Sequence, residues 1–298
     1  MRVVSSGVVS LCPELAVCGY AGVEFTPMVK AGGKERQAVV KKIDTCTLRE
    51  RAKGNAIAKV CAVLSTLSAR SPLRLNEISE LTGLNRVTAL RILEDLGEAG
   101  FVARSGNPPR YDFGPEVVAM AAAASRSFNL REIARPSLLR LAELTGDTVL
   151  LLLRSGAEAV VVDRAVGDYP IRANFLDIGS RRALGIGGGS MALLASLPEA
   201  ERDAILDMTC KRLDEYPQIT RSALETHIEQ LREQGYVTML DIVVNKMGAI
   251  GLPLLGRNDE LLGAISIVAL SERISERREM LVNALSAEAR VISRQLPG

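Results

Sequence analysis

The sequence of 298 residues is poor in the residue types on which metal and disulfide chemistry depend. It has no tryptophan, one histidine and five cysteines, and only 3% of its residues are aromatic. The cysteines are odd in number and form no CxxC pair, which is typical of a reducing cytoplasm rather than of a disulfide framework. A single histidine with scattered cysteines argues against an all-protein zinc site. We therefore expect a cytoplasmic protein without a metal ion or cofactor.

Long apolar runs are also missing. No stretch approaches the roughly 20 uninterrupted apolar residues that a membrane-spanning helix needs. Because 47% of the residues are nevertheless hydrophobic, the chain has ample material for packed cores. Its length fits two domains with an additional segment. These properties predict a soluble, two-domain protein that does not contact the membrane.

The stretch from Leu75 to Phe113 has the pattern of two short helices followed by a hairpin. Six apolar side chains recur there at three- and four-residue spacing and predict a shared small core: Ile78, Leu81, Leu84, Leu90, Leu93 and Leu96. Gly83 separates the two helices and permits a tight turn. A preceding helix over Asn55–Ser68 adds Ile57, Val60 and Leu64 to this core, with Cys61 buried beside them. The pattern favours a helix-turn-helix.

The second of these helices leaves polar residues outside its apolar stripe. Asn85 is placed to cap the first turn, and Arg86, Thr88 and Arg91 face away from the leucines. Residues near the start of such a helix reach base edges in the major groove, where arginine suits guanine and a short hydroxyl or apolar group suits thymine. We predict that these four residues contact DNA.

Downstream of Gly100, two β-favouring segments flank a turn rich in glycine, asparagine and proline. They run from Phe101 to Ala103 and from Arg110 to Phe113 and predict a hairpin wing. Arg104 and Arg110 stand at its base, where they are expected to face phosphates. A helix-turn-helix pattern alone also occurs in proteins that do not bind DNA, and the wing strengthens the DNA-binding interpretation.

The charge distribution agrees with this division. Residues 1–114 contain 16 Lys and Arg against 11 Asp and Glu, whereas residues 115–298 contain 21 against 24. The first half therefore has the sign that phosphate neutralisation requires. Residues 1–50 give no clear pattern and are interpreted as a poorly ordered extension, with a basic arm as the alternative. The expected domains are 51–114, a linker helix over 115–129, and 130–298.

The second domain alternates helices with paired strands. Strands are expected at 148–153, 159–164, 169–175, 236–240, 249–255 and 262–270, and helices at 130–146, 190–197, 224–234 and 276–294. Short turns between strand pairs indicate an α+β domain on an antiparallel sheet. A glycine-rich loop over residues 185–190 opens one helix and offers free amides to an anion. It lacks the spacing of a dinucleotide or phosphate loop, which argues against an enzyme cofactor.

Four segments together resemble the IclR family of bacterial transcription regulators. They are LNEISELTGLNRVTALRILEDLGEAGFV with the wing RYDFGPEVVAM, then RPSLLRLAELTGDTVLLLL, then ALGIGGGSMALLASLPEAER, and GYVTMLDIVVNKMGAIGLPLLGRNDELLGAISIVALSERIS. In order, they cover about 240 residues. The resemblance implies a winged helix-turn-helix, a linker helix, and a GAF-like effector-binding domain with an antiparallel sheet.

The resemblance also implies which residues line a small-molecule pocket. In the glycine loop the matching positions are Gly188 and Gly189. An ungapped match of the last segment adds Met239, Ala249, Ser266 and Val268, and the earlier strand adds Ile171. Several of these positions are polar in family members that bind small carboxylates, but here they are apolar. We therefore expect an apolar or aromatic acid as effector, with Ser266 and the loop amides as its main hydrogen-bonding groups. Core packing is the alternative for Met239 and Val268.

The remaining ionisable groups are expected to be structural. For Asp163, Arg164 and Asp168, and for Arg181 and Arg182 near the glycine loop, a catalytic or anion-binding role is the alternative to surface ion pairs, which are the commoner role of such charges. His227 lies beside an apolar helix stripe without a nucleophile elbow to serve, so a general-base role is disfavoured. The sequence thus predicts a ligand-responsive, DNA-binding repressor that forms a homodimer or homotetramer on operator DNA. Two alternatives are a small-molecule enzyme and a sensor that binds other proteins, with the winged domain serving assembly.

Overall fold

A computed structural model describes residue 49 and residues 52–125, 130–171, 176–210, 219–256 and 258–296. The expectation for residues 1–50 falls almost wholly outside the described part of the chain. Among the described helices, none is long and apolar enough to cross a membrane.

The first domain is a winged helix-turn-helix. It consists of helices α2 (Ala56–Arg70), α3 (Leu75–Thr82) and α4 (Arg86–Glu98) and of strands β1 (Val102–Ser105) and β2 (Arg110–Phe113). The two strands pair antiparallel, from Val102 opposite Phe113 to Ser105 opposite Arg110. Gly83 ends α3 in the left-handed region, at φ +73°, and its N–H donates to the Ser79 carbonyl. The turn between the helices therefore has the glycine geometry that its position predicted.

On α2 and on α4, the residues buried in the core of this domain differ from those expected. On α2 the buried side chains are Val63 and Leu67, whereas Ile57 is 73% exposed and Cys61 is exposed. The prediction for Ile57 and Cys61 was wrong because this helix carries two adjacent apolar stripes, and α3 and α4 cover only the second. On α4, Ile92 replaces Leu90 in the core cluster.

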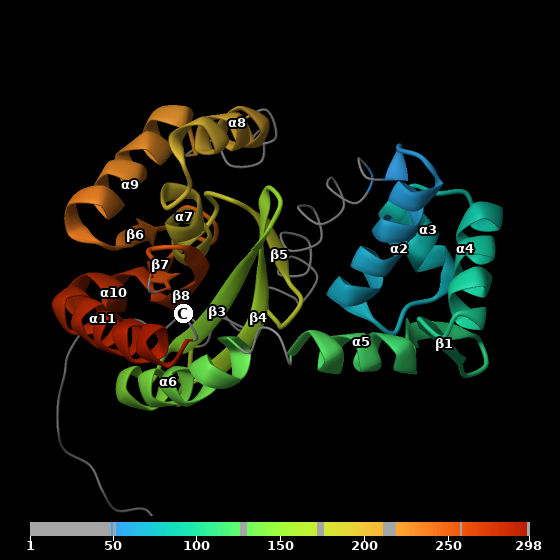
Figure 1. Cartoon of the computed structure of the whole chain (residues 1–298), viewed down its shortest axis with the longest axis horizontal. Coiled ribbons are helices and arrows are strands. Elements are labelled where there is room, and N and C mark those ends of the chain that lie inside the picture. The colour runs from blue at the N-terminus through green and yellow to red at the C-terminus, as the bar shows by residue number, and fades with distance from the viewer. Residues whose placement is uncertain are drawn as a thin grey trace, which may run out of the picture.

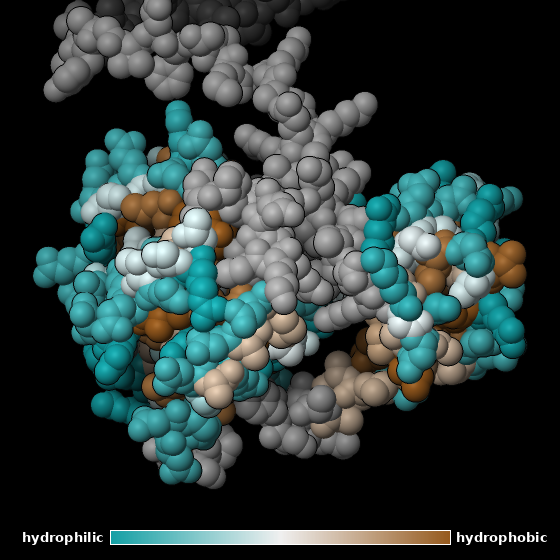
Figure 2. All heavy atoms as spheres, turned by 90° about the horizontal axis from the view of Figure 1, so that it is seen from above, coloured by the Kyte–Doolittle hydropathy of each residue, from teal (hydrophilic) through white to brown (hydrophobic). Residues whose placement is uncertain are grey.

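Two helices lead into the second domain. Helix α5 (Pro115–Ser125) follows the wing, and α6 (Leu130–Thr145) starts the second domain. Figure 1 shows α5 between the two domains. In Figure 2 the same position is drawn in tan to brown, against the mainly teal surface of the winged domain. An apolar helix therefore reaches the surface between the domains.

The second domain is built on one six-stranded antiparallel sheet in the order β5-β4-β3-β8-β7-β6. Its strands are β3 (Thr148–Ser155), β4 (Glu158–Val166), β5 (Arg181–Ala183), β6 (Val237–Leu240), β7 (Met247–Leu255) and β8 (Leu261–Leu270). Five of them match expected strands. Residues 169–171 of the strand expected at 169–175 are not in a strand, and residues 172–175 lie outside the described ones.

Helices cover both faces of this sheet (Figure 1). One face carries α6 with α10 (Ser271–Glu276) and α11 (Arg278–Gln295), and the other carries α7 (Gly188–Ala195), α8 (Glu199–Cys210) and α9 (Arg221–Gln234). Helix α8 was not predicted. The central strands consequently bury both sides, and the domain has two hydrophobic cores. The sheet residues that face α7 form the floor of the site described below.

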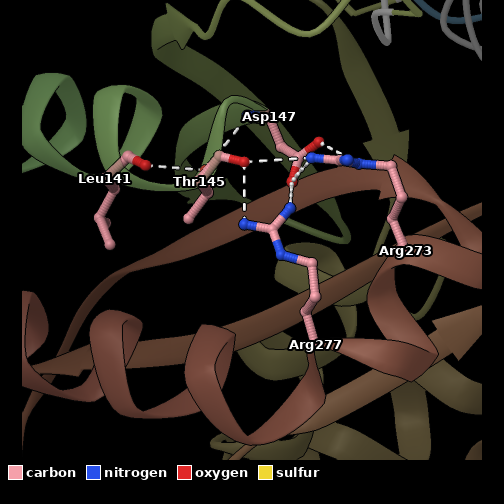
Figure 3. A network of polar contacts seen from close by, with 5 residues as sticks. All are labelled: Leu141, Thr145, Asp147, Arg273 and Arg277. Atoms are coloured by element: carbon pink, nitrogen blue, oxygen red, sulfur yellow. Dashed lines mark hydrogen bonds and ion pairs between the residues drawn. The ribbon is translucent and has the colours of Figure 1, made fainter.

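A buried ionic network joins the two ends of the domain (Figure 3). Asp147, whose side chain is 2% exposed, accepts hydrogen bonds from Arg273 and Arg277 at 3.1–3.3 Å. Both guanidinium groups also donate to the Thr145 carbonyl, and the Arg273 guanidinium stacks 3.6 Å from the Tyr169 ring centre. The network fastens the α6–β3 junction to α10 and α11.

Candidate functional site

Helix α4 separates its charged and apolar residues onto opposite sides. Ala89, Ile92 and Leu93 are buried against α2 and α3, while Arg86 and Arg91 are exposed. Thr88 is half-buried. This is the arrangement predicted for a helix that enters a DNA groove, because the supporting core holds the helix without using its outer side chains.

Val87 belongs to the same outer surface and was missed by the sequence reasoning. Its side chain is 80% exposed, although valine is apolar and the other exposed side chains near it are polar. A signal existed in the sequence, because Val87 falls outside the spacing of the buried stripe. An exposed apolar group at the start of a recognition helix is suited to the methyl group of thymine.

Asn85 has a structural role that the structure displays directly. Its side-chain oxygen accepts the N–H of Thr88 at 2.8 Å and so caps the first turn of α4. The capping prediction is confirmed. The side-chain oxygen is therefore occupied by the helix, and direct contact with DNA remains a prediction for the amide group.

The wing presents its two arginines differently. Arg104 on β1 is exposed, whereas Arg110 on β2 is half-buried and donates to the Pro72 carbonyl at 3.1 Å. A backbone bridge between Leu73 and Tyr111 reinforces this attachment of the wing to the loop before α3. Arg110 thus helps to fix the wing, and a phosphate contact from it stays a prediction.

The second domain contains a cavity between the sheet and α7. The strand register brings Met239, Ala249, Val268, Ser266 and Leu150 to the same face, since directly paired residues project to one side. The free volume is about 60 Å³. This is smaller than the roughly 150 Å³ that accommodates benzene. A ring-sized ligand therefore requires movement of flexible lining side chains such as Met239 and Met247.

Six of the seven predicted effector residues line this cavity: Gly188, Gly189, Met239, Ala249, Ser266 and Val268. Ile171 does not line it, and its side chain is 53% exposed. The reasoning placed Ile171 on a strand, but residues 169–171 form no strand. Four further lining residues, Arg182, Ile186, Gly187 and Ser190, belong to or lie near the glycine-rich loop that the sequence had singled out. The remaining lining residues were not predicted: Leu150, Leu152, Ala159, Val161, Leu176, Ser180, Ile242, Val243, Val244, Met247 and Gly248.

The glycines of the loop are required by close packing. A Cβ on Gly189 would lie 2.5 Å from the Leu152 side chain, and one on Gly188 would lie 3.0 Å from Ala249. From the sheet side, a Cβ on Gly251 would lie 2.2 Å from the Gly188 carbonyl oxygen. Helix α7 consequently approaches β7 and β8 with almost no side chain between them. The amides of its first turn have no partner within the helix, and Gly188, Gly189 and Ser190 of that turn line the cavity.

Ser190 and Ser266, which line the cavity, both donate their hydroxyl protons to groups of the protein itself. Ser266 donates to the Ile250 carbonyl at 2.8 Å, so its hydroxyl proton is used within the protein, and its role as a hydrogen-bonding group for a ligand stays a prediction. Ser190 donates to the Ala183 carbonyl at 2.9 Å and accepts the Ile186 N–H at 3.1 Å. Both hydroxyl groups can still accept a hydrogen bond.

The other ionisable residues form ion pairs, but not all at the surface. Arg181 pairs with Glu158 at 3.1 Å and Arg164 with Asp177 at 2.9 Å. The side chains of Glu158 and Asp163 are only 8% and 2% exposed, and Arg135 reaches Asp163 from α6 at 3.0 Å. The placement of Asp163 at the surface was therefore predicted wrongly.

His227 on α9 is partly buried. Burial lowers the pKa of its imidazole, whereas the Gln230 side-chain oxygen 3.4 Å from Nδ1 opposes this shift. Among the described residues, no cluster of histidine, cysteine and acidic side chains is suited to a metal ion.

Comparison with known proteins matches two parts of the chain to two family profiles. Residues 56–106 match the profile of the IclR helix-turn-helix domain, and residues 122–294 match the bacterial transcriptional regulator IclR C-terminal profile. The HTH-type transcriptional regulator KipR of Bacillus subtilis is 26% identical, over 82% of this chain and 98% of KipR. The HTH-type transcriptional regulator Rv1719 of Mycobacterium tuberculosis is 31% identical, over 78% of this chain and 88% of Rv1719.

A solved structure shares the fold. An IclR homologue from Microbacterium hydrocarbonoxydans, complexed with 4-hydroxybenzoate, superposes with a TM-score of 0.66 at 20% identity, over 80% of this chain and 98% of that one. The two profile matches, which together cover most of the chain, confirm the expected family. The chain belongs to the IclR family of bacterial transcriptional regulators, which bind DNA through a helix-turn-helix domain and are not enzymes.

Proposed function

We propose that the protein is an effector-controlled repressor that acts as a homodimer in the cytoplasm and reads operator DNA with α4. The observation that carries this is the exposure of Arg86, Val87 and Arg91 on a helix whose opposite side is fully packed. Arg86, Thr88 and Arg91 contact base edges, Val87 contacts a thymine methyl, and Arg104 contacts a phosphate. Repression requires only that the protein occupies its operator, so no polymerase-binding surface is needed.

Substitution of Arg86 tests the assignment to the groove. A duplex selected from random sequence by the full-length protein serves as operator. Arg86→Ala should weaken its binding by about 1–3 kcal/mol if the guanidinium makes a bidentate base contact. Arg232→Ala is the matched control, because Arg232 is an arginine with an 80% exposed side chain in the effector domain. Equal affinity of Arg86→Ala and wild type in gel-shift titrations at fixed salt would refute this role.

Helix α5 supports the proposed dimer. Val118 and Met120 are 69% and 54% exposed, and residues 121–123, all alanine, are exposed beside them. A second copy packed along α5 would cover this apolar side and place two winged domains on half-sites about 34 Å apart. Val118→Glu should convert the dimer to a monomer in sedimentation velocity, whereas Glu116→Gln should not. A dimer that survives Val118→Glu with unchanged affinity would place the interface elsewhere.

The effector we propose is an organic acid with an apolar or aromatic body. An almost wholly apolar lining supports the body, and the first-turn amides of α7 support the acid group. Binding would bias the arrangement of the two winged domains, with a typical coupling of about 1–3 kcal/mol. Calorimetry with 4-hydroxybenzoate and with pyruvate tests the class. Tighter binding of pyruvate than of any aromatic or alkyl acid would refute it.

A further inference from the structure

The cavity wall includes one arginine whose position follows from the strand register. On the edge strand β5, Arg182 pairs directly with Ala159 of β4. Directly opposed residues in an antiparallel pair project to the same face, and Ala159 is buried in the core on the α7 side. Arg182 therefore lies on the cavity side of the sheet, and it lines the cavity together with Ala159.

Its neighbour Arg181 lies on the other face. Arg181 pairs with Val160 in the register, donates to Glu158 at 3.1 Å and to Ser155 at 3.2 Å, and does not line the cavity. Two consecutive arginines thus have separate positions, one in an ion pair and one at the ligand cavity. The pair provides a natural control, since the two residues share chemistry and local backbone but not the face of the sheet.

Charged side chains are nearly absent from the described part of the cavity lining. Of the described residues that line the cavity, Arg182 is the only charged one, and no carboxylate is among them. Most of the rest are aliphatic or glycine, and the hydroxyl protons of Ser190 and Ser266 are donated to backbone carbonyls. The lining therefore offers one cation and very few free donors.

A second positive feature lies beside Arg182. The adjacent residue Ala183 accepts the Ser190 hydroxyl of the first turn of α7 at 2.9 Å, which ties β5 to the N-terminal end of that helix. The amides of Gly188 and Gly189 and the positive end of the helix dipole thus stand at the same end of the cavity as Arg182. Both features favour an anion at one end and an uncharged body at the other.

We propose that Arg182 binds the carboxylate of the effector and makes the cavity selective for monocarboxylates with an apolar body over their neutral isosteres. The inference rests on the proposed effector class and assigns the residue that enforces it. A guanidinium carries five N–H donors in a planar fork, so Arg182 can serve both carboxylate oxygens in addition to its other contacts. A second carboxylate on the ligand would lie among aliphatic side chains without a partner and would weaken binding.

Matched ligands and matched variants test this proposal in the full-length protein. The probes are 4-hydroxybenzoate and its neutral isostere 4-hydroxybenzamide, with cyclohexanecarboxylate and its amide as a non-aromatic pair, each titrated by calorimetry at pH 7.5. Wild type should prefer each acid over its amide by about tenfold or more. Arg182→Met should abolish this preference by weakening the acid and leaving the amide unchanged, whereas Arg181→Met should retain it.

The outcomes separate the two proposals. If wild type prefers acids and Arg182→Met does so equally, the acid class stands and the role of Arg182 is overturned. If wild type binds neither acid, or prefers the amides, both the acid class and the role of Arg182 are overturned. Unfolding curves and binding to the selected duplex show whether Arg182→Met is folded. If it is not, Arg182→Lys replaces it and should reduce the preference, because an ammonium group cannot pair bidentately; an undiminished preference contradicts the proposal.

Discussion

The two domains use arginine in opposite ways. In the winged domain Arg86, Arg91 and Arg104 are exposed around one small core, and their charge is available to a partner. In the effector domain arginines tie buried carboxylates into the fold, as Arg273 and Arg277 do at Asp147 and Arg135 does at Asp163. A domain that binds a polyanion keeps its cations at the surface, whereas a domain that holds a cavity uses them internally. The stability of the second should therefore be the more sensitive to loss of a charge.

The largest effect is expected at Asp147. Removing it by Asp147→Ala leaves two guanidinium groups that are only 21% and 26% exposed without their carboxylate. The free energy of unfolding of the effector domain should fall by about 3 kcal/mol, as measured by urea denaturation. Asp207→Ala is the control, because Asp207 pairs with Arg221 at the surface with its side chain 63% exposed, and it should cost less than about 1 kcal/mol. Similar losses of unfolding free energy in Asp147→Ala and Asp207→Ala would contradict the expected difference between a buried and a surface carboxylate.

Replacing a glycine by alanine should change stability in opposite directions at one position of each domain. Gly251→Ala introduces a Cβ 2.2 Å from the Gly188 carbonyl oxygen, so α7 must move and the effector domain should lose about 1–3 kcal/mol. Gly97→Ala in α4 meets nothing closer than 3.7 Å and should stabilise the winged domain by about 0.5–1 kcal/mol, because alanine favours a helix over glycine. Scanning calorimetry of both variants gives the signs. Stabilisation by Gly251→Ala would contradict the close packing of α7.

Asn85 allows stability and recognition to be separated within the winged domain. Asn85→Ala removes the cap on the Thr88 amide and should cost about 1 kcal/mol of stability, measured by thermal unfolding. Asn85→Ser retains a capping oxygen and should restore most of it. If Asn85→Ser restores stability but not operator affinity, the amide group contacts DNA as predicted. If it restores both, Asn85 acts only through the helix.

The smallest effect concerns pH, and it should be confined to the effector domain because the only histidine is His227. Its folded-state pKa is lowered by burial, so the unfolded chain binds a proton more readily. Stability should therefore decrease as pH falls below about 6.5, the ordinary pKa of histidine. In His227→Gln this part of the decrease should be absent from unfolding curves measured between pH 7.5 and 5. An unchanged pH dependence would mean that His227 does not contribute.

The sequence predicted the structure correctly where a local pattern is compatible with only one local structure. The turn at Gly83, the cap at Asn85 and the wing followed from local chemistry that tertiary contacts did not override. On α2 two apolar stripes were available, and only the neighbouring helices decide that Val63 and Leu67, not Ile57, are buried. Local periodicity cannot make that choice.

The family resemblance predicted seven cavity residues, of which six line the cavity and Ile171 does not. The continuous apolar run at the start of the strand at 148–155 fits its buried positions, but it does not reveal that Leu150 and Leu152 face a cavity rather than plain core. Strand β5 has only three residues, so its sequence contains too little alternation to tell which of Arg181 and Arg182 faces inward. That distinction depends on the register with β4.

The bare contact between α7 and β7 has a mechanical consequence. Where side chains separate a helix from a sheet, their rotamers can absorb a small displacement of either element. Between Gly188 and Gly251 the backbones would collide if even a methyl group were added, and no rotamer exists to yield. A ligand that displaces the start of α7 must therefore displace β7 as well. This movement is then transmitted to the sheet against which α11 packs.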